Sequence, residues 1–572
     1  MMKYKYLKEW KEPKFKHDKP IMFDSETFVP RDSKSRAKTL AFYGETRLIQ
    51  LGQGKRVYVY DVMDNPKLLK KIKKYIKGKH IVVQYAVYDM HCPMTNYMDL
   101  QPSYVEDLIY ISRHAYPELE SHSLGSVLAH TGLEVKGEEG QSDWGVETLT
   151  DEQIYYAAYD VYAMSQLLKL KSMKKARKMF TCKLDQDNLN YALSYANNGF
   201  PVCQSKLEET KETKRAEIEV LEEELPSTLN VNSPKQVCEL LGTESGNVET
   251  LSTLYLSEGN EVAGNILKLR KAKKQLSTLE KKWSFDRIYG KFNPSGAKTG
   301  RWTCSGKNAL SPQWQNLQQL DRTMKDVFGF EEDNDMYLVD ADFSALEIFS
   351  MIATFNDFDM AKVILDGNDL HTETAGLVEL KGRDAKFKRQ VAKGLNFSVG
   401  YGGGAETVQT FIKTYAQEML PLTIVTMLKD KWLKKYPATH AFHKKVGEQF
   451  KRNPHYVVVH DILGRPIRAK SYNEAINTPC QALGAEQTKI ALCFLFEKYP
   501  NAKLVNTVHD SITLEVKGFK EAKKMAKYLK RCMDESWLMV RPYASGAAQE
   551  LVMNNEAEVT KLYGGEALWK TK

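Results

Sequence analysis

Apolar strand segments that run into carboxylates occur near the beginning of the chain and again beyond its middle. Ile21-Met22-Phe23 precedes Asp24 and Glu26, and Tyr337-Leu338-Val339 precedes Asp342. Side chains of a strand alternate between its two faces, so Asp24 and Glu26 point to the same side. Sheets that present acidic groups at strand ends, between helical segments, indicate α/β domains in both parts of the chain.

Length and composition limit the classes of protein that remain. A chain of 572 residues is too long for one domain and suits three or four. With 42% apolar and 27% charged residues it is typical of globular proteins. It contains no run of about 18 apolar residues, and its basic N-terminus has no signal-peptide core. Eight scattered cysteines without a CxxC pair favour reduced thiols in the cytoplasm. The net charge of +9 hints at a polyanionic partner.

Carboxylates from three segments form the first candidate site. Besides Asp24 and Glu26, Asp89 follows the strand at 81–83, and Tyr156 and Asp160 lie four apart on a predicted helix, facing one way. A solvated strand end is the ordinary explanation of Asp-x-Glu alone. Four converging carboxylates, however, would repel one another unless divalent cations neutralised them. Such a two-metal site serves phosphodiester chemistry, and a nearby tyrosine can orient water.

A second pair of aspartates lies far apart in the sequence. Asp342 ends a strand, and Asp510 occupies a tight turn between the strands at 504–508 and 512–516. Either residue alone is typical of a turn or cap. Together they could hold two magnesium ions against a triphosphate.

The segment Arg389–Gly402 carries a repeat of four residues. Arg389, Lys393, Phe397 and Tyr401 would form one slowly winding stripe about 18 Å long on a helix. Two cations followed by two rings suit a nucleoside triphosphate lying along the helix. An amphipathic helix with solvated basic ends and a buried aromatic pair is the alternative.

The N-terminal motifs resemble the proofreading 3′–5′ exonucleases that use Asp-Glu-Asp-Asp ligands and a tyrosine. The resemblance implies an RNase H-like domain at about 1–180, with Asp24, Glu26, Asp89 and Asp160 as metal ligands and Tyr156 as the catalytic tyrosine. Tyr85 stands where many relatives carry Asn.

The remaining motifs resemble family A DNA polymerases, which include bacterial DNA polymerase I and phage replicative enzymes. Asp342–Glu347 is similar to motif A, Arg389–Gly402 to motif B and Val508–Ser511 to motif C. The implied fold is α/β and multidomain, with a right-hand polymerase domain at 181–572. The expected subdomains are a thumb at about 181–330, a palm at about 331–358 and 466–572, and fingers at about 359–465.

The resemblance also implies individual roles. Asp342 and Asp510 would hold two Mg²⁺ per active site, with Mn²⁺ as an alternative. Glu347 would be the steric gate against ribose, and the nucleotide would contact His371, Arg389, Lys393, Phe397 and Tyr401. The expected DNA contacts are Arg301, Gln315, Asn316, Asn477, Gln481, His509, Lys271 and Lys274.

Three departures and several alternatives accompany this hypothesis. Phe349, Ser511 and Asn473 stand where the family usually has Arg, Glu and Arg. The rival functions are a 3′–5′ exonuclease whose C-terminal half only binds DNA, and a non-enzymatic nucleic-acid-binding protein. The expected partners are primer-template DNA and dNTPs, with a processivity factor or a replisome helicase or primase, and no membrane. The favoured origin is a bacteriophage, in which case the enzyme would act as a replicase in the host cytoplasm.

Overall fold

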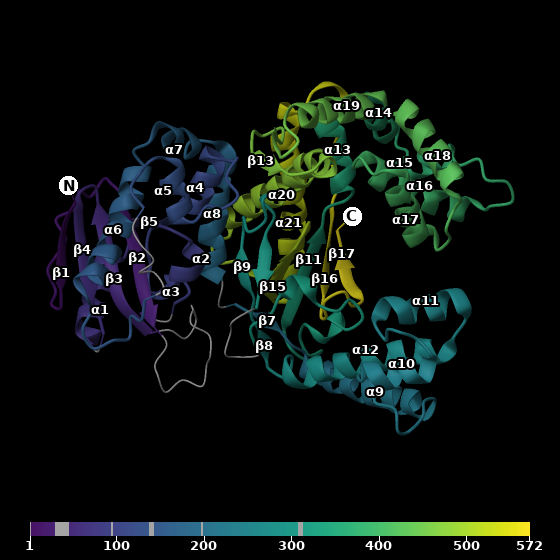
Figure 1. The fold of residues 1–572 in the computed structure, drawn as a ribbon, viewed down its shortest axis with the longest axis horizontal. Helices are drawn as coiled ribbons and strands as arrows, with labels where there is room; N and C mark the ends of the chain where they lie inside the picture. Colours follow the sequence, from purple (N-terminus) through teal and green to yellow (C-terminus); the bar gives the residue numbers. More distant parts are fainter. Residues whose placement is uncertain are drawn as a thin grey trace.

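In the computed structural model, residues 2–28, 45–63, 65–92, 95–135, 142–195, 198–306 and 313–571 are described. Two bodies, each centred on a sheet, lie side by side in Figure 1. The N-terminal body, residues 2–195, is coloured purple to blue, and the C-terminal body, residues 198–571, teal to yellow. The C-terminal body extends two helical projections on the side away from the N-terminal body.

A mixed six-stranded sheet forms the centre of the N-terminal body. Its strand order is β1-β4-β3-β2-β5-β6, and β2 pairs antiparallel with β3 and parallel with β5. The strands are β1 (Lys3–Leu7), β2 (Ile21–Phe28), β3 (Glu45–Gln53), β4 (Arg56–Asp61), β5 (His80–Val83) and β6 (Tyr104–Asp107). The helices are α1 (Pro66–Ile76), α2 (Ala86–Asp89), α3 (Tyr97–Leu100), α4 (Leu108–Ala115), α5 (Leu124–His130), α6 (Asp151–Leu167), α7 (Lys171–Ala176) and α8 (Phe180–Tyr195). Helix α6 begins at a capping box of Thr150 and Gln153 and packs on β2, β3 and β4, which aligns it with the end of β2.

The C-terminal body is built on an antiparallel five-stranded sheet in the order β14-β15-β11-β16-β17. Its strands are β11 (Met336–Asp342), β14 (Lys503–Val508), β15 (Ser511–Lys517), β16 (Glu556–Thr560) and β17 (Ala567–Lys570). Helix α21 (Phe519–Val540) packs on β11, β15 and β16, and α20 (Tyr472–Lys498) packs on α21 and on α13 (Leu346–Phe355). The 3-10 turns η4 (Arg541–Tyr543) and η5 (Gly546–Gln549) follow α21.

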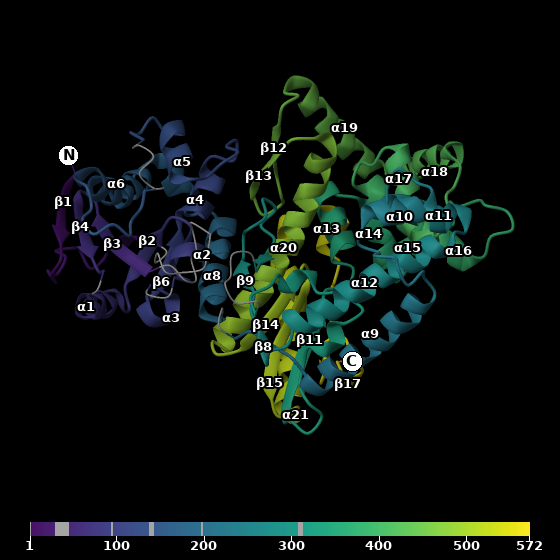
Figure 2. The same cartoon turned by 60° about the horizontal axis from the view of Figure 1, so that its bottom comes forward.

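The first projection, the helical arm, has a small core of its own. It consists of α9 (Gln204–Glu223), α10 (Pro234–Leu241), α11 (Val248–Glu258) and α12 (Glu261–Lys281). Helices α9 and α12 run alongside each other, as Figure 2 shows, and bury Leu221, Ile266 and Leu269. Short elements join the arm to the sheet: β7 (Phe200–Pro201), β8 (Arg287–Ile288), β9 (Lys291–Asn293), β10 (Thr303–Ser305), η2 (Leu317–Gln319) and η3 (Lys325–Val327).

The second projection, the helical lobe, follows β11 and α13. It contains α14 (Phe358–Leu365), α15 (Leu370–Ala375), α16 (Ala385–Gly400), α17 (Ala405–Ala416), α18 (Leu422–Lys435) and α19 (Pro437–Arg452). A hairpin of β12 (Val457–His460) and β13 (Pro466–Ala469) returns the chain to α20. Within the described residues, no helix has the length and apolar character needed to cross a membrane.

A buried ionic network joins the two bodies at α8. Asp185 accepts hydrogen bonds from both terminal nitrogens of Arg465, at 2.9 and 2.7 Å, and from Lys489. Arg465 also donates to Glu486. All four side chains are buried. Burial alone would raise the pKa of Asp185, but the charges of Arg465 and Lys489 hold it below the usual range.

The network predicts a large loss of stability in the Asp185→Ala variant. Removal of this carboxylate leaves Arg465 and Lys489 buried with excess positive charge, so we expect the free energy of unfolding to fall by about 3–5 kcal/mol. Urea denaturation measures the change. Lys183→Ala, at an exposed position of the same helix, is the control. A loss below about 1 kcal/mol for Asp185→Ala would contradict the prediction.

Candidate active sites

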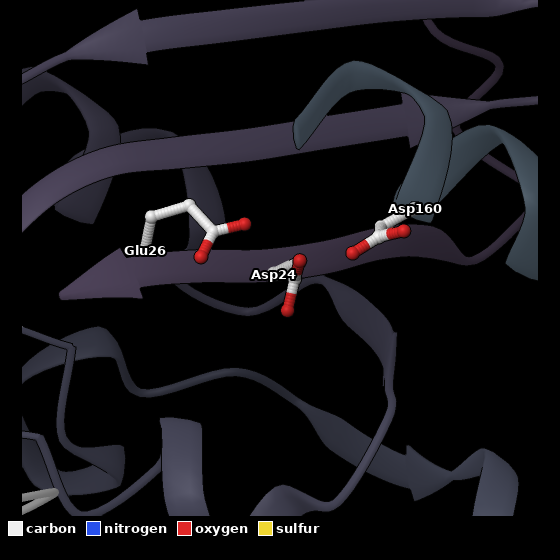
Figure 3. Close-up of side chains that lie close together, drawn as sticks. All are labelled: Asp24, Glu26 and Asp160. Atoms are coloured by element: carbon white, nitrogen blue, oxygen red, sulfur yellow. The ribbon is translucent and has the colours of Figure 1, made fainter. Parts of the chain in front are cut away.

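Three predicted metal ligands of the N-terminal body lie together. Asp24 and Glu26 project from β2 and Asp160 from α6, and each offers an oxygen within 4.8 Å of the others. Figure 3 shows the three carboxylates turned toward one another. The period-two spacing on β2 and the packing of α6 on that strand produce this arrangement. The cluster is a hard oxygen donor set of the kind that binds Mg²⁺ or Mn²⁺.

Burial and like charge raise the pKa values of the cluster. Burial raises the pKa of Asp24 to about 7. Burial, followed by the charges of Asp24, Asp160 and Asp89, raises the pKa of Glu26 well above its usual value. The pKa of Asp160 is raised for the same two reasons, burial and Asp24. Since ionised carboxylates at this distance repel, a bound divalent cation is the natural counterion, and the residues fit one.

Asp89, the fourth predicted ligand, lies next to this cluster but is engaged by a serine. It is the last residue of α2, is 2% exposed, and accepts a 2.7 Å hydrogen bond from the Ser25 hydroxyl. Burial and then the Asp24 charge raise its pKa. Asp89 therefore lies within the field of the cluster without sharing its closest oxygen contacts.

Tyr156, the predicted catalytic tyrosine, lies one helical turn before Asp160 on α6. The two residues lie on the same face of the helix. Burial, followed by the charges of Asp160 and Glu26, raises the pKa of Tyr156, so the phenol stays protonated and can donate a hydrogen bond.

Asp107 is a structural determinant of this site to which the sequence analysis gave no role. Its buried carboxylate accepts hydrogen bonds from the backbone N–H groups of Tyr85, Ala86 and Ile109, at 3.1, 2.8 and 2.8 Å. It thereby fixes the start of α2, the helix that carries Asp89. Its position as the last residue of β6 and N-cap of α4 is the signal that could have identified it.

Strand pairing brings the two aspartates of the C-terminal body together. Asp342 lies opposite Ser511 in the β11–β15 ladder, so the turn that contains Asp510 lies beside the end of β11. The backbone carbonyl of Asp510 accepts a 3.3 Å hydrogen bond from Phe343. Burial and the Asp510 charge raise the pKa of Asp342 to about 7. This pair also suits divalent cations.

Asp340 extends the acidic face of β11 and has no predicted role. It lies two residues before Asp342 and accepts a 2.6 Å hydrogen bond from the Thr513 hydroxyl. Burial raises its pKa to about 6. The same alternation that relates Asp24 to Glu26 could have identified it.

A cavity of about 210 Å³ next to Asp510 collects several predicted residues from distant segments. Glu347 of α13 and Tyr401, which follows α16, line it, with Gly484 of α20 as a small neighbour. The other predicted residues in its lining are Arg301, Gln481 and His509. Burial raises the pKa of Glu347, and the nearby Arg301 charge lowers it.

The stripe predicted on the segment Arg389–Gly402 lies on α16, with one difference. The helix ends at Gly400, so Tyr401 is the C-cap residue and not part of the helix. Arg389 forms a 3.0 Å ion pair with Asp369, and the Lys393 ammonium lies 5.0 Å from the ring centre of Tyr415. Phe397 and Tyr401 are both half-buried.

His371 approaches this stripe from α15. Its ring lies 5.4 Å from that of Phe397, and its Nδ1 atom is 2.9 Å from the Asn396 amide nitrogen. Asn396 is buried and also accepts hydrogen bonds from Thr374 and Trp432. It positions His371, a role that the repeat of four could not reveal because Asn396 lies off the stripe.

The remaining predicted DNA contacts differ in their environments. Gln315 bonds the Lys282 carbonyl and the Trp283 indole, and Asn316 caps η2. The Asn477 Oδ1 atom is buried and has no hydrogen-bond partner among the described residues. Lys271 and Lys274 are exposed on α12.

Two other basic residues of α12, next to these lysines in the sequence, have partners within the helical arm. Arg270 donates to the carbonyls of Val231 and Gly246, and Lys273 pairs with Glu222 of α9. These two residues therefore stabilise the helical arm itself.

The three departures also have distinct surroundings. Phe349 is buried against Trp537, with ring centres 5.2 Å apart. Ser511 lies opposite Asp342 and bonds the Val508 carbonyl. Asn473 is exposed near the start of α20.

Comparison with known proteins identifies two matching families. The family described as DNA polymerase family A matches residues 202–544, and the family described as 3′–5′ exonuclease matches residues 4–174. The chain is 28% identical to DNA polymerase I of Aquifex aeolicus over 534 residues, covering 86% of this chain and 89% of the relative. It is 26% identical to a DNA polymerase of Mycobacterium phage L5, covering 51% and 47%.

A solved structure shares the fold. It is the POL domain of Pol1 from M. smegmatis in complex with DNA primer-template and dNTP. The TM-score is 0.67 at 16% identity, over 95% of both chains.

The raised pKa values predict how pH affects stability without metal. Asp24 and Asp342 bind protons in the folded chain up to about pH 7, whereas unfolded aspartates release them near pH ~4. The folded state holds more protons between these values, so the free energy of unfolding falls as pH rises through this window.

Urea denaturation in EDTA at pH 5 and pH 8 tests this dependence. We expect Asp24→Asn to reduce the fall by about 1 kcal/mol or more, and Mg²⁺ or Mn²⁺ to restore stability at pH 8 in the unchanged chain. Asp18→Asn, at an exposed position, is the control. If the free energy of unfolding of Asp24→Asn fell between pH 5 and pH 8 as much as that of the unchanged chain, the result would contradict the raised pKa of Asp24.

Proposed function

The chain belongs to DNA polymerase family A and carries a 3′–5′ exonuclease domain before its polymerase domain, and on this premise we propose which residues perform its two reactions. It is a DNA-directed DNA polymerase that extends a primer from dNTPs and proofreads the primer end. The observation that carries the proposal is the strand register that sets Asp342 next to the turn of Asp510, which itself lines the cavity with Glu347 and Tyr401.

Asp342 and Asp510 are the proposed ligands of the polymerase metals. Two Mg²⁺ ions, or Mn²⁺ in their place, supply charge neutralisation for the attacking and leaving oxygens when bound there. Asp342 ends β11 and Asp510 lies in the turn that precedes β15, and the pairing of these two strands sets the spacing of the carboxylates. The protein contributes positioning and electrostatic stabilisation to phosphoryl transfer.

Helices α15 and α16 provide the proposed triphosphate contacts. Arg389, Lys393 and His371 would face the phosphates, and Phe397 the sugar and base. A phosphate that approaches Arg389 meets a guanidinium now paired with Asp369, so phosphate oxygens replace a carboxylate at the same cation. This exchange keeps the charge of Arg389 compensated throughout binding.

The cavity beside Asp510 is the proposed position of the nucleotide sugar. Glu347 and Tyr401 line it, and a ribose 2′-hydroxyl would meet the Glu347 side chain there. Glu347 would therefore select deoxyribose by steric exclusion of the 2′-hydroxyl. Ser350 and Cys480 complete part of the same wall.

The proposed DNA contacts surround this cavity. Arg301, Gln481 and His509 line it directly, and Asn477 of α20, whose buried Oδ1 atom has no hydrogen-bond partner among the described residues, is proposed as a further contact. The exposed Lys271 and Lys274 of the arm would contact backbone phosphates. Gln315 and Asn316 would act through the loop conformation that they stabilise.

The exonuclease reaction is assigned to the first cluster. Asp24, Glu26, Asp89 and Asp160 are the proposed ligands of two Mg²⁺ ions. The Tyr156 phenol, protonated and one turn from Asp160, would orient the attacking water by a hydrogen bond. Release of Asp89 from Ser25 would let it join the other three carboxylates.

The domain limits follow from these assignments. We assign residues 1–180 to the exonuclease domain, about 181–330 to the thumb, about 331–358 and 466–572 to the palm, and about 359–465 to the fingers. The helical arm falls in the thumb range and the helical lobe in the fingers range. A processivity factor, a replisome helicase or primase, and a cytoplasmic location stay predictions from the sequence.

Separate loss of the two activities tests the assignments. On a labelled primer-template with Mg²⁺ and dNTPs, we expect Asp342→Ala to lower extension at least about a thousandfold while shortening without dNTPs continues. Asp24→Ala should abolish shortening and leave extension unchanged, because each carboxylate belongs to only one cluster. Asp18→Ala is the control for both. Shortening without any extension by the unchanged chain would support the exonuclease-only alternative.

Phe397→Tyr tests the placement of the nucleotide on α16. Family relatives with Phe at this position discriminate against dideoxynucleotides, and those with Tyr accept them. The added hydroxyl would supply a polar group beside a sugar that has lost its own, so we expect at least about tenfold better relative incorporation of chain terminators. Competition between ddNTP and dNTP measures the ratio. Phe411→Tyr, at an exposed position of α17, is the control, and an unchanged ratio in Phe397→Tyr would reject the placement.

A further inference from the structure

Tyr85 has a backbone conformation that a bulky residue rarely adopts. Its φ and ψ are 70° and 63°, in the left-handed region, where Gly and Asn are the usual residues. The buried Asp107 holds this conformation by accepting the N–H groups of Tyr85 and Ala86. The chain therefore retains an aromatic residue at a position where its backbone would favour Asn, and strain of this kind concentrates at functional positions.

The Tyr85 ring is exposed to solvent at the boundary between the two bodies. Its exposed fraction is 43%, whereas the neighbouring Ala86 and Val87 are buried. The ring lies at the start of α2, which contacts β9 of the C-terminal body, and the two elements are close in Figure 1. From β9, the Lys291 ammonium lies 5.9 Å from the ring centre.

The same short helix connects this ring to the exonuclease carboxylates. Asp89 ends α2 four residues after Tyr85. Burial lowers the pKa of Lys291, and the nearby Cys92 and Asp89 act in the opposite direction. Tyr88, between them, is bonded through its hydroxyl to Thr27 of β2, the strand that carries Asp24 and Glu26. An aromatic face and a cation thus stand together at the short helix that carries Asp89, on the side that contacts the polymerase body.

We propose that the Tyr85 ring stacks on an unpaired base of the single DNA strand whose 3′ end enters the exonuclease site, with Lys291 contacting an adjacent phosphate. Every base has a π face, so such a contact binds a mispaired end of any sequence. A duplex, whose bases are already stacked, gains nothing from it. The ring thereby favours frayed ends over paired ones, and this inference rests on the proposed exonuclease function.

Tyr85→Asn is the decisive variant because Asn suits the left-handed backbone and removes only the ring. We expect its thermal stability to equal or exceed that of the unchanged chain. Its KM for shortening a single-stranded oligonucleotide with Mg²⁺ should rise about tenfold, with kcat within about twofold. Tyr85→Phe should keep the unchanged KM, since it keeps the ring. Tyr4→Asn, at an exposed tyrosine of the outer strand β1, is the control.

A spectroscopic measurement in EDTA reports stacking without cleavage. Oligonucleotides carry 2-aminopurine at one of the last four positions, and we expect fluorescence quenching at one of them with the unchanged chain and Tyr85→Phe, lost in Tyr85→Asn. Unchanged KM and quenching in Tyr85→Asn would overturn the proposal. If the unchanged chain fails to shorten any strand, the exonuclease assignment itself is wrong. This result differs from an unchanged KM in Tyr85→Asn, which would contradict only the stacking proposal.

Discussion

Both active sites depend on backbone ladders that hold carboxylates closer together than their charges allow in water. The β2 backbone fixes Asp24 and Glu26 on one face, and the β11–β15 register fixes Asp342 beside Asp510. Each cluster is partly withdrawn from solvent, and the pKa values of Asp24 and Asp342 rise to about 7 in consequence. The free energy of the surrounding sheet offsets this repulsion in the folded chain, and a divalent cation removes it. Metal binding and folding are therefore coupled in both bodies.

The α8 network gives these two sites a fixed relation. Glu486 and Lys489 lie within about one turn of Gly484 and Ala485 on α20, and the latter pair lines the cavity beside Asp510. The same helix thus contacts the cavity on one turn and the N-terminal body, through Asp185, on the next. Ion pairs require stricter geometry than apolar packing, so this contact specifies one arrangement of the two bodies.

Local patterns in the sequence predict the parts of each site that depend on local geometry. The period of two on β2, the spacing of four between Tyr156 and Asp160, and the turn at Asp510 all follow from neighbouring residues. The bond from Ser25 to Asp89, the anchoring of α2 by Asp107 and the positioning of His371 by Asn396 join residues tens of positions apart. Such hydrogen bonds leave no periodic signal, and the left-handed backbone of Tyr85 is likewise imposed by a partner from another strand.

Helices α15 and α16 behave as one unit because a single carboxylate serves both. Asp369 caps α15 by accepting the Thr372 N–H at 2.9 Å, and the same Oδ2 atom accepts Arg389 of α16 at 3.0 Å. A phosphate bound by Arg389 would compete for the second of these bonds and would leave the cap of α15 intact. His371 stays fixed through Asn396, which is itself part of α16. The residues proposed to meet the triphosphate therefore lie on one packed pair of helices, joined both by Asp369 and by the contact between Asn396 and His371.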